Sequence, residues 1–120
     1  MSALLDAQCR FASLVPRLID RAVASGFRLT LGEVYRTPEQ AQWNAAHGKG
    51  IANSLHTQRL AIDVNLYGPD GYYDGSTQPG RMAYRDLGTY WKGLDPSCCW
   101  GGDFSSPDLD HYSFTFGGVK

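Results

Sequence analysis

Hydrophobic residues recur along the chain with two periods, and each period predicts one type of secondary structure. Helical spacing, with apolar residues three or four positions apart, runs from Phe11 to a stop at Gly26 and returns over residues 82–94. Pro16 lies inside the first of these segments and predicts either a kink or the first turn of a new helix. We therefore expect two amphipathic helices, each with one apolar face.

Apolar and polar residues alternate in three other segments, as expected for strands with one buried face. These segments are residues 27–34, 60–66 and 111–116. After the first of them, Thr37 has the position of an N-cap, with Pro38 in the first turn and Gln40 at the capping-box position of a short helix. Residues 67–80 are rich in Gly, Pro, Asp and Tyr and predict a hairpin or a long loop. Since no linker or internal repeat interrupts this order, the pattern favours one α+β domain over residues 1–120.

Composition mainly excludes classes of function. The chain has 42% hydrophobic and 19% charged residues, and its formal net charge of −1 predicts no nucleic-acid or anionic-membrane partner. No segment approaches the roughly 20 apolar residues of a membrane span, and residues 1–6 lack the features of a signal peptide. The three cysteines, Cys9, Cys98 and Cys99, form no even disulfide framework and fit a reducing compartment. We therefore expect synthesis in the cytoplasm, no membrane insertion, and a separate export route for any role outside the cell.

The candidate chemistry lies in two short motifs. The first contains His56 and, seven positions later, Asp63; the second ends the run Asp108-Leu109-Asp110-His111. Two histidines and an aspartate can hold a zinc ion and leave a fourth position for water, as catalytic zinc sites do. Because residues seven apart on a strand face opposite sides, a turn between His56 and the strand must bring the imidazole back over Asp63. Asp108 is placed to take a proton from the water, so the motifs predict a small zinc hydrolase.

Each candidate also has a purely structural interpretation. His111 could be a histidine of a sheet, bonded to a neighbouring hydroxyl, and Asp108 could cap a turn after a proline. Arg36, which follows the first strand, could form a surface salt bridge. His47 fits the C-terminus of the short helix, where a cation is favoured, so we leave it out of the site.

The two motifs together resemble those of the M15 peptidases, which include D-Ala-D-Ala carboxypeptidases, related dipeptidases and phage L-alanyl-D-glutamate endolysins. The family pattern Ser-x-His-x-x-Gly-x-Ala-x-Asp is matched by Ser54, His56, Ala61 and Asp63. The later acid-x-x-His element is matched by Asp108 and His111, and the upstream arginine of a Tyr-Arg-Thr turn by Arg36. Arg59 stands where the pattern has glycine. If that glycine serves a tight turn, Arg59 needs a different turn.

This resemblance implies a fold of the D,D-peptidase/hedgehog type, with a small antiparallel sheet, helices packed on one side and one zinc ion per chain on the other. The implied zinc ligands are His56, Asp63 and His111. Asp108 is implied as the general base, and Arg36 as the group that binds the substrate carbonyl or the developing oxyanion. Ser54 is expected to orient a ligand by a hydrogen bond. Asp110 is the rival base, but side chains of neighbouring strand residues diverge, which favours Asp108.

The resemblance further implies a monomeric peptidoglycan peptidase that cleaves a stem-peptide bond, with L-Ala–D-Glu as the first candidate. The short chain resembles phage endolysins, which would be made in the host cytoplasm and reach the cell wall by holin-type release. A D-Ala-D-Ala carboxypeptidase would use the same metal chemistry. An inactive, zinc-stabilised module that binds the cell wall is the alternative outside enzymes.

Residues 67–80, including Tyr72 and Tyr73, are expected to border the site.

Overall fold

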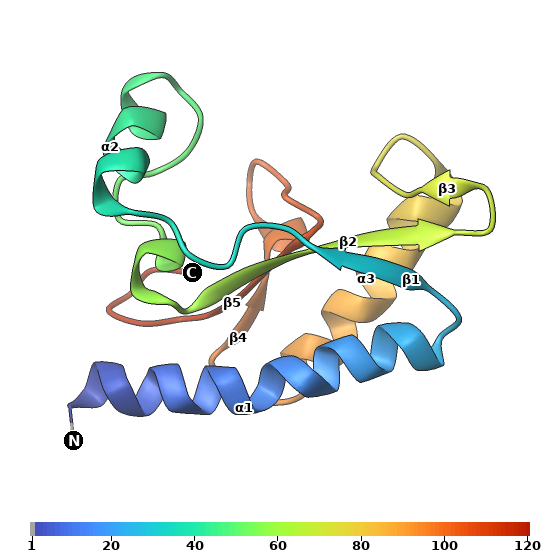
Figure 1. Cartoon of the computed structure of the whole chain (residues 1–120), viewed down its shortest axis with the longest axis horizontal. Coiled ribbons are helices and arrows are strands. Elements are labelled where there is room, and N and C mark those ends of the chain that lie inside the picture. The colour runs from blue at the N-terminus through green and yellow to red at the C-terminus, as the bar shows by residue number, and fades with distance from the viewer. Residues whose placement is uncertain (1) are drawn as a thin grey trace.

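Three helices flank the sheet in the computed structural model, which describes residues 2–120 (Figure 1). They are α1 (Ala3–Ala24), α2 (Pro38–Ala46) and α3 (Gln78–Lys92). Helix α2 forms as its sequence predicts, because Thr37 Oγ1 accepts a hydrogen bond of 3.1 Å from the backbone N–H of Gln40. His47 caps its C-terminal end, and its Nδ1 lies 2.7 Å from the carbonyl oxygen of Trp43. The expectation that His47 belongs to the helix end is therefore confirmed.

An antiparallel sheet with the strand order β1-β2-β5-β4 lies at the centre of the fold. Its strands are β1 (Arg28–Leu31), β2 (Ala61–Gly68), β4 (Cys98–Trp100) and β5 (His111–Phe114), and β3 (Gly71–Tyr72) forms a short hairpin with the end of β2. Strand β2 is the longest. It pairs with β5 through its first half and with β1 through its second half, so residues from several segments meet beside it.

The hydrophobic core lies between the sheet and helices α1 and α3. Strand β2 and the residue before it contribute Leu60, Ile62, Val64 and Leu66 to this core, as their alternation predicts. The ring of Trp91, fully buried on α3, meets Phe11 and Tyr112 edge-on, and its Nε1 donates to the carbonyl oxygens of Cys99 and Ser113. Figure 1 shows α1 along one side of the sheet and α2 beyond the other. The expected α+β fold is confirmed, with two of the three helices forming the packed layer.

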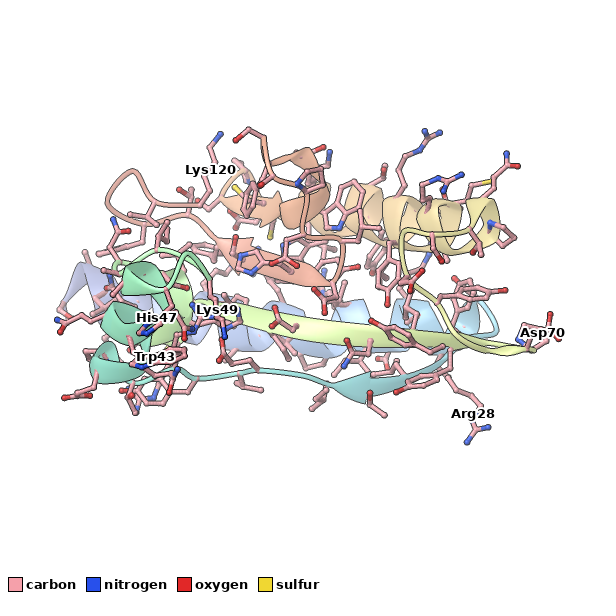
Figure 2. The ribbon with its side chains drawn as sticks, turned by 90° about the horizontal axis from the view of Figure 1, so that it is seen from above. Arg28, Trp43, His47, Lys49, Asp70 and Lys120 are labelled. Carbon is pink, nitrogen blue, oxygen red and sulfur yellow. The ribbon has the colours of Figure 1, made fainter. Side chains whose placement is uncertain are left out.

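The elements differ from the expectations in three places. Helix α1 begins at Ala3 rather than near Phe11, because Leu4 and Ala7 extend its apolar stripe onto the core, and Pro16 lies inside the helix without starting a new one. Strand β4 was not expected. The 67–80 segment contains a hairpin whose tip is remote from α2, as the position of Asp70 in Figure 2 shows, but Gly75 of the same segment lies against Leu109, between Asp108 and Asp110.

Candidate metal centre

The register of two strands brings the first pair of candidate ligands together. Asp63 of β2 lies directly opposite His111 of β5. The neighbouring hydrogen bond from Val64 N to Asp110 O, of 2.9 Å, shows that the Asp63–His111 pair itself is not hydrogen-bonded. In such pairs the side chains approach most closely, with Cβ atoms about 4.5–5.5 Å apart. Backbone pairing therefore sets the spacing of these two side chains.

His56 reaches the same place from a turn before the strand. It lies in the short 3-10 helix η1 (Leu55–Gln58), where Ser54 Oγ accepts a hydrogen bond of 3.3 Å from the backbone N–H of His56. The turn closes at Arg59, which is left-handed with φ 57° and ψ 38°. This conformation is the one that glycine adopts easily, so the expectation that Arg59 needs a different turn is wrong. Its guanidinium lies over the ring of Tyr35, 4.3 Å from the ring centre.

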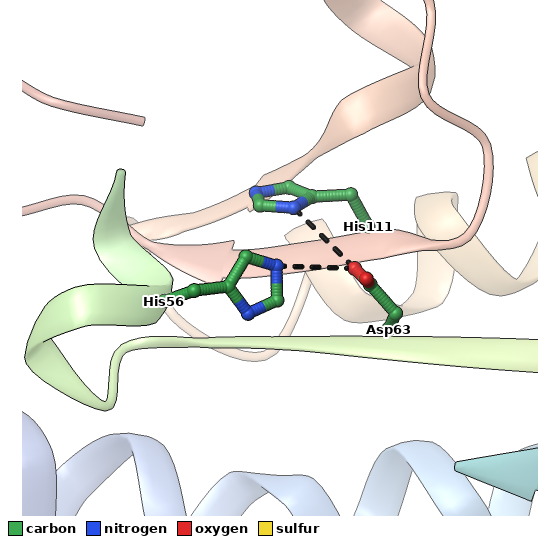
Figure 3. A group of neighbouring side chains, drawn as sticks. All are labelled: His56, Asp63 and His111. Carbon is green, nitrogen blue, oxygen red and sulfur yellow. Dashed lines mark ion pairs between the residues drawn. The ribbon is translucent and has the colours of Figure 1, made fainter. Parts of the chain in front are cut away.

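One atom of each of the three side chains faces the same point (Figure 3). His56 Nε2 lies 3.2 Å and His111 Nδ1 lies 3.6 Å from Asp63 Oδ1. A tetrahedron of ligands about 2.0–2.1 Å from a zinc ion has edges of roughly 3.3 Å, so these separations fit one. The side chains of His56 and His111 are 2% and 8% exposed, and Asp63 Oδ1 is buried without a well-oriented hydrogen bond. A buried carboxylate oxygen that lacks a hydrogen bond and is faced by two imidazole nitrogens fits a metal site better than a packed core.

The histidines of the cluster keep the Asp63 carboxyl group ionised. Burial by itself raises the pKa of Asp63, but the imidazoles of His111 and His56 outweigh that effect and lower the pKa to about 2. The carboxylate is therefore ionised at neutral pH and can serve as an anionic ligand.

Two further carboxylates lie beside Asp63. The side chains of Asp63, Asp108 and Asp110 each offer an oxygen within 4.8 Å of the others. Asp108 is more than half exposed, and its Oδ2 lies 4.0 Å from His111 Nδ1, on the open side of the cluster. The expected divergence of Asp110 is wrong, because β5 begins only at His111 and strand alternation does not extend to Asp110. Burial and the neighbouring carboxyl groups of Asp108 and Asp63 raise the pKa of Asp110 well above its ordinary value.

Arg36 lies beside the cluster and is held there by its neighbours. Its Nη2 lies 2.5 Å from Glu33 Oε1, and its backbone N–H donates to the carbonyl oxygen of His56 at 3.1 Å. The Arg36 side chain is only 15% exposed, so it is not a surface salt bridge. Its buried Nε makes no hydrogen bond to residues 2–120, so one donor of the guanidinium is unsatisfied.

Comparison with known proteins places this arrangement in a family. A family model described as D-alanyl-D-alanine carboxypeptidase, of the M15 peptidases, matches residues 46–114, more than half of the chain. The chain belongs to the M15 peptidase family. None of the curated proteins compared with it gives a significant match. Among solved structures, the L-Ala D-Glu endopeptidase ChiX of Serratia marcescens superposes with a TM-score of 0.63 over 88% of this chain and 80% of that chain, at 20% identity. At this identity the likeness supports the fold alone.

The M15 domain fixes its Asp108–His111 segment through glycines that the sequence patterns did not reveal. Asp108 N donates to Gly101 O at 2.9 Å, and a Cβ on Gly101 would collide with the Asp108 carbonyl group and lie 2.8 Å from His111 Cβ. Trp100 Nε1 donates to Leu109 O at 2.8 Å, and its indole packs directly on the backbone of Gly88 in α3. Close glycine packing therefore supports the segment that carries Asp108 and His111.

Sequence patterns also missed two residues that follow β1. The backbone of Gly32 lies against Asp63, where an added Cβ would be 3.0 Å from Asp63 Cβ. Glu33 contacts both Arg36 and His56. The Glu-x-x-Arg spacing after a strand is the only local signal that could have pointed to Glu33.

The helices within residues 2–120 include none with the length and apolar character that a membrane span requires.

Proposed function

We propose that this M15 domain is a zinc-dependent peptidoglycan peptidase that cleaves the L-Ala–D-Glu bond of the stem peptide and acts as a phage endolysin. The observation that carries the proposal is the buried His56–Asp63–His111 cluster with Asp108 on its open side. The choice of bond is made by analogy with the protein of similar fold, an L-Ala D-Glu endopeptidase. We further propose that one monomer binds one zinc ion.

Each residue has a role that follows from its place. His56, Asp63 and His111 would hold the ion, which when bound supplies Lewis acidity for peptide hydrolysis. Asp108, exposed and adjacent, would take a proton from the attacking water and return it to the leaving amine. Arg36 would donate an N–H of its guanidinium to the scissile carbonyl oxygen, where negative charge develops. Ser54 holds the turn that presents His56.

Digestion of purified Gram-negative sacculi by the zinc-loaded protein tests the proposal. Mass spectrometry should find stem peptides that lack L-Ala, and Asp108→Ala should reduce their formation by about a hundredfold or more while zinc content stays unchanged. Asp110→Asn serves as the comparison, because a large loss in that variant together with retained activity in Asp108→Ala would make Asp110 the base. Full zinc occupancy after replacement of both His56 and His111 would refute the assigned metal site.

The description of the matching family model favours a second candidate, a D-Ala-D-Ala carboxypeptidase. Such an enzyme would release only the terminal D-Ala from the same sacculi. Binding to sacculi without any product, with zinc bound, would favour a cell-wall binding module instead.

For the endolysin we propose synthesis in the host cytoplasm and holin-type release. Lysis of host cells only when the protein is expressed together with a holin would support this route.

A further inference from the structure

Glu33 faces two functional groups of the centre at once. Its Oε1 lies 2.5 Å from Arg36 Nη2 and 3.6 Å from His56 Nδ1. Backbone hydrogen bonds hold this segment against the strand of the metal ligand: Gly32 N donates to Asp63 O at 2.8 Å, and Asp63 N donates to Glu33 O at 2.9 Å. The backbone of Glu33 is thereby held beside Asp63, and its carboxylate lies between Arg36 and His56.

The imidazole of His56 needs a partner on the side where Glu33 lies. Its Nε2 is the nitrogen that faces Asp63, so metal binding through Nε2 leaves the proton on Nδ1. That Nδ1 is fully buried and has no hydrogen-bond partner in residues 2–120. A buried N–H without an acceptor is costly, and histidine ligands of metals nearly always donate their second N–H to a carboxylate, a carbonyl or water. Glu33 supplies the carboxylate, and a small rotation of its side chain would turn the 3.6 Å contact into a hydrogen bond.

We propose that Glu33 is a positioning residue whose carboxylate accepts the Nδ1–H of His56 and holds the guanidinium of Arg36. One side chain would then orient a metal ligand and the cation that receives the substrate carbonyl. This inference rests on the metal site of the proposed function. It differs from a plain Glu33–Arg36 ion pair, which would leave metal binding unaffected.

Zinc affinity, measured by competition with a chelator and with zinc as the only ligand, tests the proposal. Glu33→Ala should weaken zinc binding by about ten- to a hundredfold, the usual effect of losing such a partner, while Glu33→Gln keeps an acceptor and should lose less. Glu39, the other glutamate of the chain, is exposed in the first turn of α2, so Glu39→Ala is the matched control and should bind zinc like the wild type.

Nitrogen NMR of histidine-labelled, zinc-loaded protein gives a second readout. The wild type and Glu33→Gln should show a protected Nδ1–H on His56, and Glu33→Ala should lose it. Zinc affinity within twofold of wild type in both Glu33 variants, with the Nδ1–H signal unchanged, would overturn the proposal. If Glu33→Ala does not fold, the zinc-loaded wild type decides: a protected Nδ1–H on His56 supports the proposal, and an Nδ1–H that exchanges freely with water contradicts it. None of these measurements depends on which bond is cleaved, so failure of the proposed peptidase activity is separately visible.

Discussion

The packing of Gly88 against Trp100 predicts a large effect from a single methyl group. A Cβ on residue 88 would lie 2.5 Å from Trp100 Cγ and closer still to Cδ2. Because carbon atoms need about 3.5 Å, the indole must move by roughly 1 Å. Such overpacking costs about 1–3 kcal/mol, and the strained hydrogen bond from Trp100 Nε1 to Leu109 O adds about 1 kcal/mol. The higher helix propensity of alanine offsets about 1 kcal/mol of this loss of stability.

Gly88→Ala should therefore lower the free energy of unfolding by about 1–3 kcal/mol. Urea denaturation of the zinc-free protein measures this change. Gly93→Ala, at the C-cap of the same helix, is the matched control, because its Cβ would come no closer than 3.4 Å to another atom and its φ of −79° suits alanine. That variant should be as stable as the wild type or slightly more stable.

The double variant Gly88→Ala, Trp100→Phe shows whether the indole is the cause. If the collision with Trp100 is responsible, the alanine should cost less beside the smaller phenylalanine ring than beside tryptophan. A Gly88→Ala protein as stable as Gly93→Ala would refute the reasoning, because the indole could then yield without loss.

Three further outcomes are expected. Since the pKa of Asp63 is about 2 in the folded protein against 3.8 for the free group, zinc-free protein should lose about 2 kcal/mol of stability as pH falls from about 5 to 1, and Asp63→Asn should lack this loss in acid denaturation curves. Arg59→Gly should be about 1 kcal/mol more stable than Arg59→Ala in urea, since only glycine adopts φ 57° without strain; the reverse order would contradict the left-handed turn. Zinc at a hundredfold excess over its dissociation constant should stabilise the wild type by about 2.7 kcal/mol in thermal unfolding, and a variant lacking His56 and His111 should show no such gain.

The sequence predicts those elements in which a local pattern and the tertiary packing agree. Thr37 caps α2 through a hydrogen bond within four residues, and the alternation over 60–66 becomes the buried face of β2. Strand β4 spans only Cys98–Trp100, which is too short for alternation to be recognised. The start of α1 is missed because Leu4 and Ala7 are only partly buried and their role depends on what packs against them.

Some residues of the candidate site can be predicted from the sequence, and others cannot. His56, Asp63, His111 and Asp108 can be proposed from sequence because histidine and carboxylate residues at these spacings are chemically distinctive. For Glu33 the Glu-x-x-Arg spacing indicates a contact with Arg36 only, since nothing near it in the sequence indicates that a distant turn brings a buried imidazole to its side chain. The role of glycines such as Gly101 is equally invisible, because the groups that exclude a Cβ come from other segments.

The pairing of Asp63 with His111 across two strands has a consequence for how this centre can change during evolution. Peptide groups form the ladder between β2 and β5, and every residue except proline supplies them alike. Neighbouring side chains can therefore be exchanged over long periods without altering the distance between the two ligands. A one-residue insertion or deletion within either strand is different, because it would turn one ligand to the opposite face of the sheet. The centre should thus tolerate extensive substitution and be lost through a single shift in strand length.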